Sequence, residues 1–136
     1  MESVHFTVEE AEYLLPRLGM LLQQMQELKR QHDRHFAAVG ELRDKMKSNG
    51  NIVEDELDRQ QRALADAAGE INKLIGQVRE MGCELKDIDE GLIDFRSVMD
   101  GREVYLCWKK GEDHIGWWHE IGSGFSSRRP LEGRDL

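Results

Sequence analysis

The side chains best suited to chemistry gather in the last third of the sequence, which contains Asp94, Cys107, His114 and His119. A thiol beside an imidazole can act as a nucleophile, and both groups, with a carboxylate, can also bind a transition metal. Such residues would serve a small-molecule or metal-dependent enzyme. A carboxylate close to the thiol makes it a weaker nucleophile, because the negative charge raises the thiol pKa. A cysteine on a strand is more often a small buried side chain. We therefore expect no catalytic residue and treat the enzyme as the alternative.

Two further histidines, His32 and His35, lie about one helical turn apart and could present nitrogens to one metal ion. Metal sites in helical bundles need further ligands from the facing helix, usually glutamates. If the two long helices described below are aligned about their connecting loop, Ala68 and Leu64 face this pair, with Gln61 nearby. These residues do not complete a metal site. We predict no metal or other cofactor here and interpret the pair as a polar layer that fixes helix register.

Helical periodicity dominates the N-terminal half. Thr7 and Glu10 have the spacing of a capping box, which starts a helix. From there to Met46, apolar residues repeat at alternating intervals of three and four, the pattern of helices that pack as coiled coils. Pro16 removes one backbone hydrogen bond and predicts a kink. We therefore expect a first helix over residues 7–47, kinked near Pro16.

A break separates this helix from a second one. Asn49 and Gly50 interrupt the pattern, and Asn51 with Glu54 predicts a new helical start. The second helix is expected over residues 51–81. Because the connection is short, the two helices must run antiparallel as a long helical hairpin.

Beyond Gly91 the apolar period changes to two, which is typical of strands. Asp100-Gly101 and Gly111-Glu112 each have the composition of a two-residue hairpin turn. Together they predict a three-stranded antiparallel meander over residues 91–121. In that meander Asp94 pairs with Cys107, and His114 lies diagonally within about 7–8 Å of the thiol.

The same two turns assign the aromatic side chains to the two faces of the sheet. Leu106 pairs with Trp117, which places Trp117 on the apolar face. Tyr105 and Trp118 then share the opposite face, where they form an apolar patch typical of an interface or a ligand groove. Residues 122–136 are expected to form a loop-like tail. The predicted fold class is therefore α+β: one single domain over residues 1–136, with the meander packed on the end of the hairpin.

Composition argues against several functions. The net charge of −8 is confined to residues 1–95, which hold 12 Lys and Arg against 20 Asp and Glu. Without a basic stripe, we expect no nucleic-acid partner. There is no apolar run long enough to span a membrane and no secretory leader, so we expect no membrane association. Two cysteines do not make a disulfide framework. The expected location is cytoplasmic, with free thiols.

Several motifs resemble those of a family of small prokaryotic proteins of unknown function. The resemblance rests on residues 6–11 and 14–18 near the start and on residues 91–95, 101–108, 117–120 and 124–125 near the end. It therefore covers both ends of the chain, while the heptad-patterned middle would match any coiled coil. The resemblance implies no catalytic residues.

The function we expect is a non-enzymatic scaffold or protein-interaction module that acts as a homodimer. Leu15, Leu22 and Phe36 extend the apolar surface of the first helix beyond its heptad seam. Phe36 lies about 30 Å along that helix, beyond the reach of the sheet. A second copy, related by a two-fold axis, is the simplest cover for it. The expected interface residues are Phe36, Tyr105 and Trp118. The alternative is a small-molecule or metal-dependent enzyme with a pocket at the junction of sheet and helices. A third hypothesis is that the acidic hairpin regulates an unknown protein partner.

Overall fold

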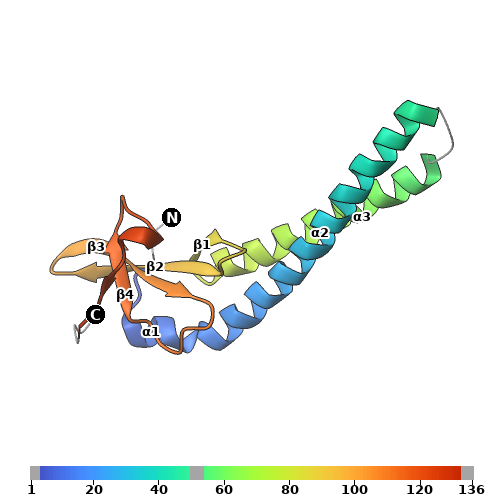
Figure 1. Ribbon diagram of the computed structural model, residues 1–136. Coiled ribbons are helices and arrows are strands. Elements are labelled where there is room, and N and C mark those ends of the chain that lie inside the picture. Colours follow the sequence, from blue (N-terminus) through green and yellow to red (C-terminus); the bar gives the residue numbers. More distant parts are fainter. Residues whose placement is uncertain (1–3, 50–53, 133–136) are drawn as a thin grey trace. The chain divides into compact units, whose positions relative to one another are not determined.

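The structure is a computed structural model that describes residues 4–49 and 54–132 (Figure 1). It is an α+β protein with two long helices packed together and one antiparallel sheet. The chain divides into two compact units, one of residues Met1–Gln23 with Ile75–Leu136 and one of Gln24–Leu74. Over the two described ranges, no helix is long and apolar enough to cross a membrane.

The first helix, α1, runs from Val8 to Tyr13 and begins at the predicted capping box. The Glu10 amide donates to Thr7 Oγ1 (3.1 Å), and the Thr7 amide donates to Glu10 Oε1 (2.9 Å). A turn at Leu14 separates α1 from α2, which spans Leu15–Asn49. The interruption lies next to Pro16, whose missing N–H and crowded ring both weaken the helix one turn earlier.

The unit of residues 24–74 is a helical hairpin made by most of α2 and the larger part of α3 (Glu54–Glu80). The predicted hairpin is therefore confirmed. Its expected loop and the Asn51 cap fall at residues 50–53, outside the described residues. The seam is thin: Met25, Val39 and Ala67 are buried in it, while most other seam residues remain half-buried.

The sheet has five strands in the order β1-β2-β3-β4-β5, so the predicted number of three was wrong. The strands are β1 Glu84–Asp87, β2 Leu92–Met99, β3 Arg102–Lys109, β4 Trp117–Glu120 and β5 Arg129–Pro130. The two missed strands are the edges. Each is too short to show an alternating pattern, and β5 ends in a proline, which sheets tolerate only at an edge. A 3₁₀ helix, η1 (Phe125–Ser127), precedes β5 in the segment predicted to be a tail.

The β2–β3 hairpin has the predicted register. Asp100 and Gly101 both have positive φ (52° and 80°), as a two-residue type I′ turn requires. This turn sets Asp94 opposite Cys107 and Phe95 opposite Leu106.

The predicted β3–β4 register was wrong by one residue. Leu106 pairs with Trp118 and Cys107 with Trp117, and residues 110–116 connect the strands in place of a two-residue turn. Glu112 stabilises this longer connection, because its carboxylate accepts a hydrogen bond from the Lys109 amide (2.8 Å). A shift of one residue exchanges the two faces of a strand, so Trp118 lies on the apolar face where Trp117 was expected.

The apolar face packs under the N-terminal segment. Phe6 contacts Phe95 edge to face, with ring centroids 5.4 Å apart. Its carbonyl accepts a hydrogen bond from the buried Ser97 hydroxyl (2.6 Å). These contacts fix the orientation of the sheet, and the opposite face carries the side chains described next.

Candidate functional site

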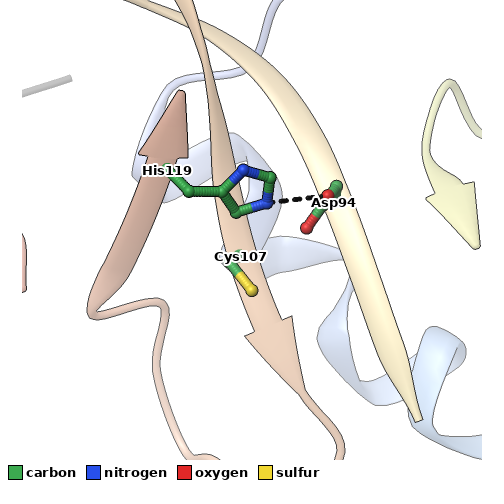
Figure 2. A group of neighbouring side chains, drawn as sticks. All are labelled: Asp94, Cys107 and His119. Atoms are coloured by element: carbon green, nitrogen blue, oxygen red, sulfur yellow. Dashed lines mark hydrogen bonds and ion pairs between the residues drawn. The ribbon is translucent and has the colours of Figure 1, made fainter. Parts of the chain in front are cut away.

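Three side chains on three neighbouring strands converge on one point of the sheet (Figure 2). Asp94 comes from β2, Cys107 from β3 and His119 from β4. Their ligand atoms all lie within 4.8 Å of one another. The three residues are only 3%, 1% and 1% exposed. Among the residues that the structure describes, this is the group of His, Cys and acidic side chains that could hold a metal ion.

The strand registers explain how these side chains meet. Asp94 is paired with Cys107, and His119 is paired with Tyr105, two residues along β3. The imidazole therefore reaches across β3 to the carboxylate, as Figure 2 shows. His119 Nε2 lies 2.9 Å from Asp94 Oδ2. The Tyr105 ring packs beside the imidazole, with ring centroids 5.3 Å apart, and keeps the imidazole pointed towards Asp94.

The contacts of His119 fix where its protons lie. Nδ1 lies 2.8 Å from the backbone oxygen of Glu120, which can only accept, so Nδ1 carries a hydrogen. Nε2 faces a carboxylate oxygen, so a second proton lies between His119 and Asp94.

Burial controls the acidity of the two other groups. It raises the pKa of the Asp94 carboxyl, and the neighbouring His119 offsets part of that shift. Burial also raises the pKa of the Cys107 thiol to about 12, with Asp94 acting in the same direction and Arg128 against it. At neutral pH the free thiol is protonated and a poor nucleophile. Neither imidazole nitrogen faces the sulfur as a base would, since both have other partners. The arrangement suits metal binding better than nucleophilic catalysis.

A pocket of about 120 Å³ opens beside Asp94 and Cys107. The segment after β4 forms one side of it, and β1, β2 and β3 supply the rest. Its lining residues are Lys86, Leu92, Asp94, Cys107, Ser123, Gly124 and Phe125. Phe125 and Lys86 are partly exposed, so the pocket is reached from solvent.

A network of charged side chains lies on the same face of the sheet. Glu84 accepts hydrogen bonds from the Tyr105 hydroxyl (3.0 Å) and from Arg96 Nε (3.1 Å). Its carboxylate also pairs with Lys86 Nζ (3.1 Å), whose ammonium group lies over the Tyr105 ring at 4.9 Å. Lys86 is therefore held at the pocket by two contacts.

Arg128 fixes the other side of the pocket. Its guanidinium makes a two-pronged ion pair with Glu112 (3.2 and 2.8 Å). It also stacks on Trp117 and Phe125, at 4.4 and 4.3 Å from the ring centroids. The η1 segment is thus tied to the β3–β4 connection, and Phe125 is held at the pocket.

Of the four residues proposed from the sequence, the structure brings together Asp94, Cys107 and His119 but not His114. His114 is exposed in the β3–β4 connection. The sequence placed it near the thiol because the predicted turn was too short, and the true register puts His119 there. The signal that could have identified His119 is the apolar Trp118 next to it, since neighbouring strand residues face opposite ways.

The other residues proposed from the sequence are not members of this cluster. His35 Nδ1 contacts Gln60 Oε1 (2.6 Å), and His32 stacks on Phe36 with centroids 6.5 Å apart. Phe36 is 66% exposed. Tyr105 and Trp118 are both buried and lie on opposite faces of the sheet. The predicted shared patch of these two aromatic residues was therefore wrong, because it depended on the slipped register.

A second pocket, of about 310 Å³, lies where the last turns of α3 meet β1. It is lined by Ile75, Arg79, Cys83, Glu84, Leu85 and Lys86. Burial raises the pKa of the Cys83 thiol to about 12, so this cysteine is not an activated one. It lies at a junction of helix and sheet, but the residues proposed from the sequence for such a pocket (Asp94, Cys107, His114 and His119) do not line it.

The fold and the site together define the protein as an α+β protein with a buried Asp–Cys–His cluster beside a small pocket. The chain belongs to the family described as uncharacterized conserved protein DUF2203, whose model matches residues 5–131. The resemblance to a family of unknown function is thereby confirmed. Neither the curated proteins nor the solved structures contain a match.

Proposed function

We propose that Asp94, Cys107 and His119 bind a divalent transition metal, with zinc as the best fit, and that this metal is the protein's functional centre. The observation that carries the proposal is the convergence of three different metal-binding groups within 4.8 Å, all of them buried. Thiolate and imidazole with one carboxylate suit zinc better than the hard cations, which prefer oxygen ligands.

The geometry fits a zinc ion with small adjustments. Zinc lies about 2.0–2.3 Å from nitrogen, oxygen and sulfur ligands, so the ligands of a tetrahedral site lie about 3.3–3.8 Å apart. His119 Nε2 and Asp94 Oδ2, now 2.9 Å apart, would have to separate slightly, and a pair at the 4.8 Å limit would have to approach by about 1 Å. The Glu120 carbonyl holds the Nδ1 hydrogen of His119 (2.8 Å), which leaves Nε2 as the ligand. Such backbone contacts are typical of metal-binding histidines.

The charge of the site is also suited to a divalent ion. Without metal, the cluster holds the shared His119–Asp94 proton and the Cys107 thiol proton, and it is neutral. A dication that replaces both protons leaves a carboxylate, a thiolate and a neutral imidazole, so the cluster is neutral again. A buried site tolerates this exchange because no uncompensated charge is created.

Three protein ligands leave one position of a tetrahedral ion for another molecule. In this chain the adjoining pocket of about 120 Å³ lies beside two of the ligands. Three ligands with one open position are typical of catalytic zinc, whereas structural zinc usually has four protein ligands. The chemistry this supports is Lewis-acid activation of a water or of a small molecule in the pocket. We therefore favour a metal-dependent enzyme over a purely structural module.

Metal analysis of the protein expressed without a histidine tag tests this proposal. We expect about one equivalent of zinc, or of cobalt after exchange, with the charge-transfer absorption of a cobalt–thiolate bond. Cys107→Ser and His119→Gln should abolish stoichiometric binding. Cys83→Ser and His114→Gln are the matched controls and should retain it. Circular dichroism checks that each variant is folded. Absence of stoichiometric metal in wild-type protein supplied with zinc, or equal loss in the controls, would refute the proposal.

We also propose that two copies associate through the helical hairpin of residues 24–74. Phe36 is 66% exposed there, and the hairpin seam buries few side chains. The unit holds nine Lys and Arg against ten Asp and Glu, so its net charge of −1 does not oppose a second copy. A two-fold pair of hairpins would bury the aromatic ring and the half-buried seam together.

Sedimentation equilibrium tests the dimer. Wild-type protein should be dimeric at micromolar concentration, and Phe36→Glu should give monomers. Tyr13→Glu is the matched control, because Tyr13 is also an exposed aromatic residue (84%) but lies on α1. A wild-type monomer, or equal dissociation of both variants, would contradict the dimer.

A further inference from the structure

The size and the lining residues of the pocket beside the proposed metal ligands limit which molecules it can bind. Its volume of about 120 Å³ is a little below the ~150 Å³ of an apolar cavity that holds one benzene, so it admits only a small molecule. Molecules of about four to six non-hydrogen atoms match this size.

The lining of the pocket has two kinds of surface. Asp94 and Cys107 lie on one side, where the metal would sit, and Lys86 supplies a cationic group. Leu92 and Phe125 supply apolar walls. A ligand that satisfies both kinds of surface needs an anionic group with a short apolar body. A carboxylate fits, because one oxygen can bind the metal while the other accepts from the ammonium group.

Lys86 is already positioned for this role. Its Nζ pairs with Glu84 (3.1 Å) and lies over the Tyr105 ring (4.9 Å), so little side-chain freedom is left to lose on binding. An ammonium group has three hydrogens, so it can donate to Glu84 and to a ligand at the same time. Phosphate normally requires several donors, often a forked arginine. Arg128, which stacks on the pocket residue Phe125, is already engaged with both Glu112 oxygens.

We infer that this pocket takes a short-chain carboxylic acid, which completes the coordination of the metal and is held by Lys86. The inference rests on the metal site proposed above. It names the substrate class of that site as small acids with one apolar end.

Titration of cobalt-loaded protein with sodium acetate, propionate, benzoate and phosphate tests the inference. We expect saturable changes in the cobalt absorption with acetate and propionate. Propionate should bind about fourfold more tightly, the ratio for burying one methylene group. Benzoate should bind poorly because it exceeds the pocket. Lys86→Gln should weaken propionate binding at least about tenfold, the size of one charge-assisted hydrogen bond. Lys73→Gln removes a positive charge on α3 that pairs with Glu70 and does not line the pocket, and it should leave the affinity within about twofold.

The outcomes separate the two proposals. If cobalt binds with its thiolate band and the carboxylates leave the spectrum unchanged, the carboxylate inference is overturned and the metal site stands. Phosphate binding more tightly than propionate, or equal effects of the two lysine variants, also overturns the inference. If cobalt does not bind to folded wild-type protein, both proposals fail.

Discussion

The register of β4 decides whether the His119 side chain points into the cluster. The same register decides which of the two adjacent tryptophans is buried, so their contributions to stability test it. Trp118 is 5% exposed and lies opposite Leu106 on the apolar face. Trp117 lies half-buried on the other face, where the Arg128 guanidinium stacks on it at 4.4 Å. Burial of a tryptophan removes about 150–250 Å² from water, or about 4–6 kcal/mol at 25 cal/mol per Å². Truncation of a buried large aromatic costs about 3–5 kcal/mol in practice.

We therefore expect Trp118→Ala to lower the free energy of unfolding by about 3–5 kcal/mol. Trp117→Ala should cost about 1–2 kcal/mol, mainly through its lost cation–π contact and partial burial. Urea denaturation, followed by far-ultraviolet circular dichroism, gives both values on a common slope. Tyr13→Ala, at an exposed position on α1 (84%), is the control and should stay within about 0.5 kcal/mol of wild type. A larger loss for Trp117→Ala than for Trp118→Ala would mean that β4 is displaced by one residue. His119 would then face away from Asp94, and the metal site would lose its third ligand.

Three further predictions test the packing around the site. The pKa of Cys83 is raised from 9.0 to about 12, so the folded protein keeps this proton longer than the unfolded chain. The resulting stability is complete below pH 9 and is lost as pH rises towards 12, by about 1.4 kcal/mol per pH unit. Cys83→Ala should therefore show a smaller fall in unfolding free energy between pH 8 and 10 than wild type, and an equal fall would contradict this. Ser97→Ala should cost about 1–3 kcal/mol in urea denaturation, because it leaves the Phe6 carbonyl without its buried donor; a loss under 0.5 kcal/mol, about the level of a surface change, would contradict it. Arg128→Met should release η1, seen as faster amide hydrogen exchange at residues 123–128, with β2 and β3 unchanged; unaltered exchange there would show that the Glu112 pair does not hold the segment.

The parts of the fold that the sequence predicted are those set by neighbours in the chain. The Thr7–Glu10 capping box involves residues three apart, and the Asp100-Gly101 turn needs only two residues that accept positive φ. The turn alone was enough to place Asp94 opposite Cys107. Two of the three members of the cluster were therefore paired correctly from local information.

The third member depended on contacts between distant parts of the sequence. The β3–β4 connection is held by the Ile115 amide, which donates to Glu12 Oε2 on α1 (2.9 Å), across most of the chain. The Trp108 indole also donates to the Glu112 carbonyl (2.9 Å) inside the connection. Gly111-Glu112 has the composition of a tight turn, and the contact with Glu12, 103 residues away, cannot be read from that composition. The same limit applies to β1 and β5, whose pairing comes from the strands beside them.

Each of the three clustered side chains comes from a different strand, and this has a consequence for how a bound ion acts on folding. Positions 94, 107 and 119 are far apart along an extended chain, so the unfolded protein offers an ion only single, separate ligands. An ion that binds only the folded sheet stabilises it by the full mass-action amount, about 2.7 kcal/mol at a free concentration one hundred times the Kd. The β2–β3 and β3–β4 pairings would both be held by this one ion. Metal supply would then change the fraction of the protein that is folded, independently of any reaction in the pocket.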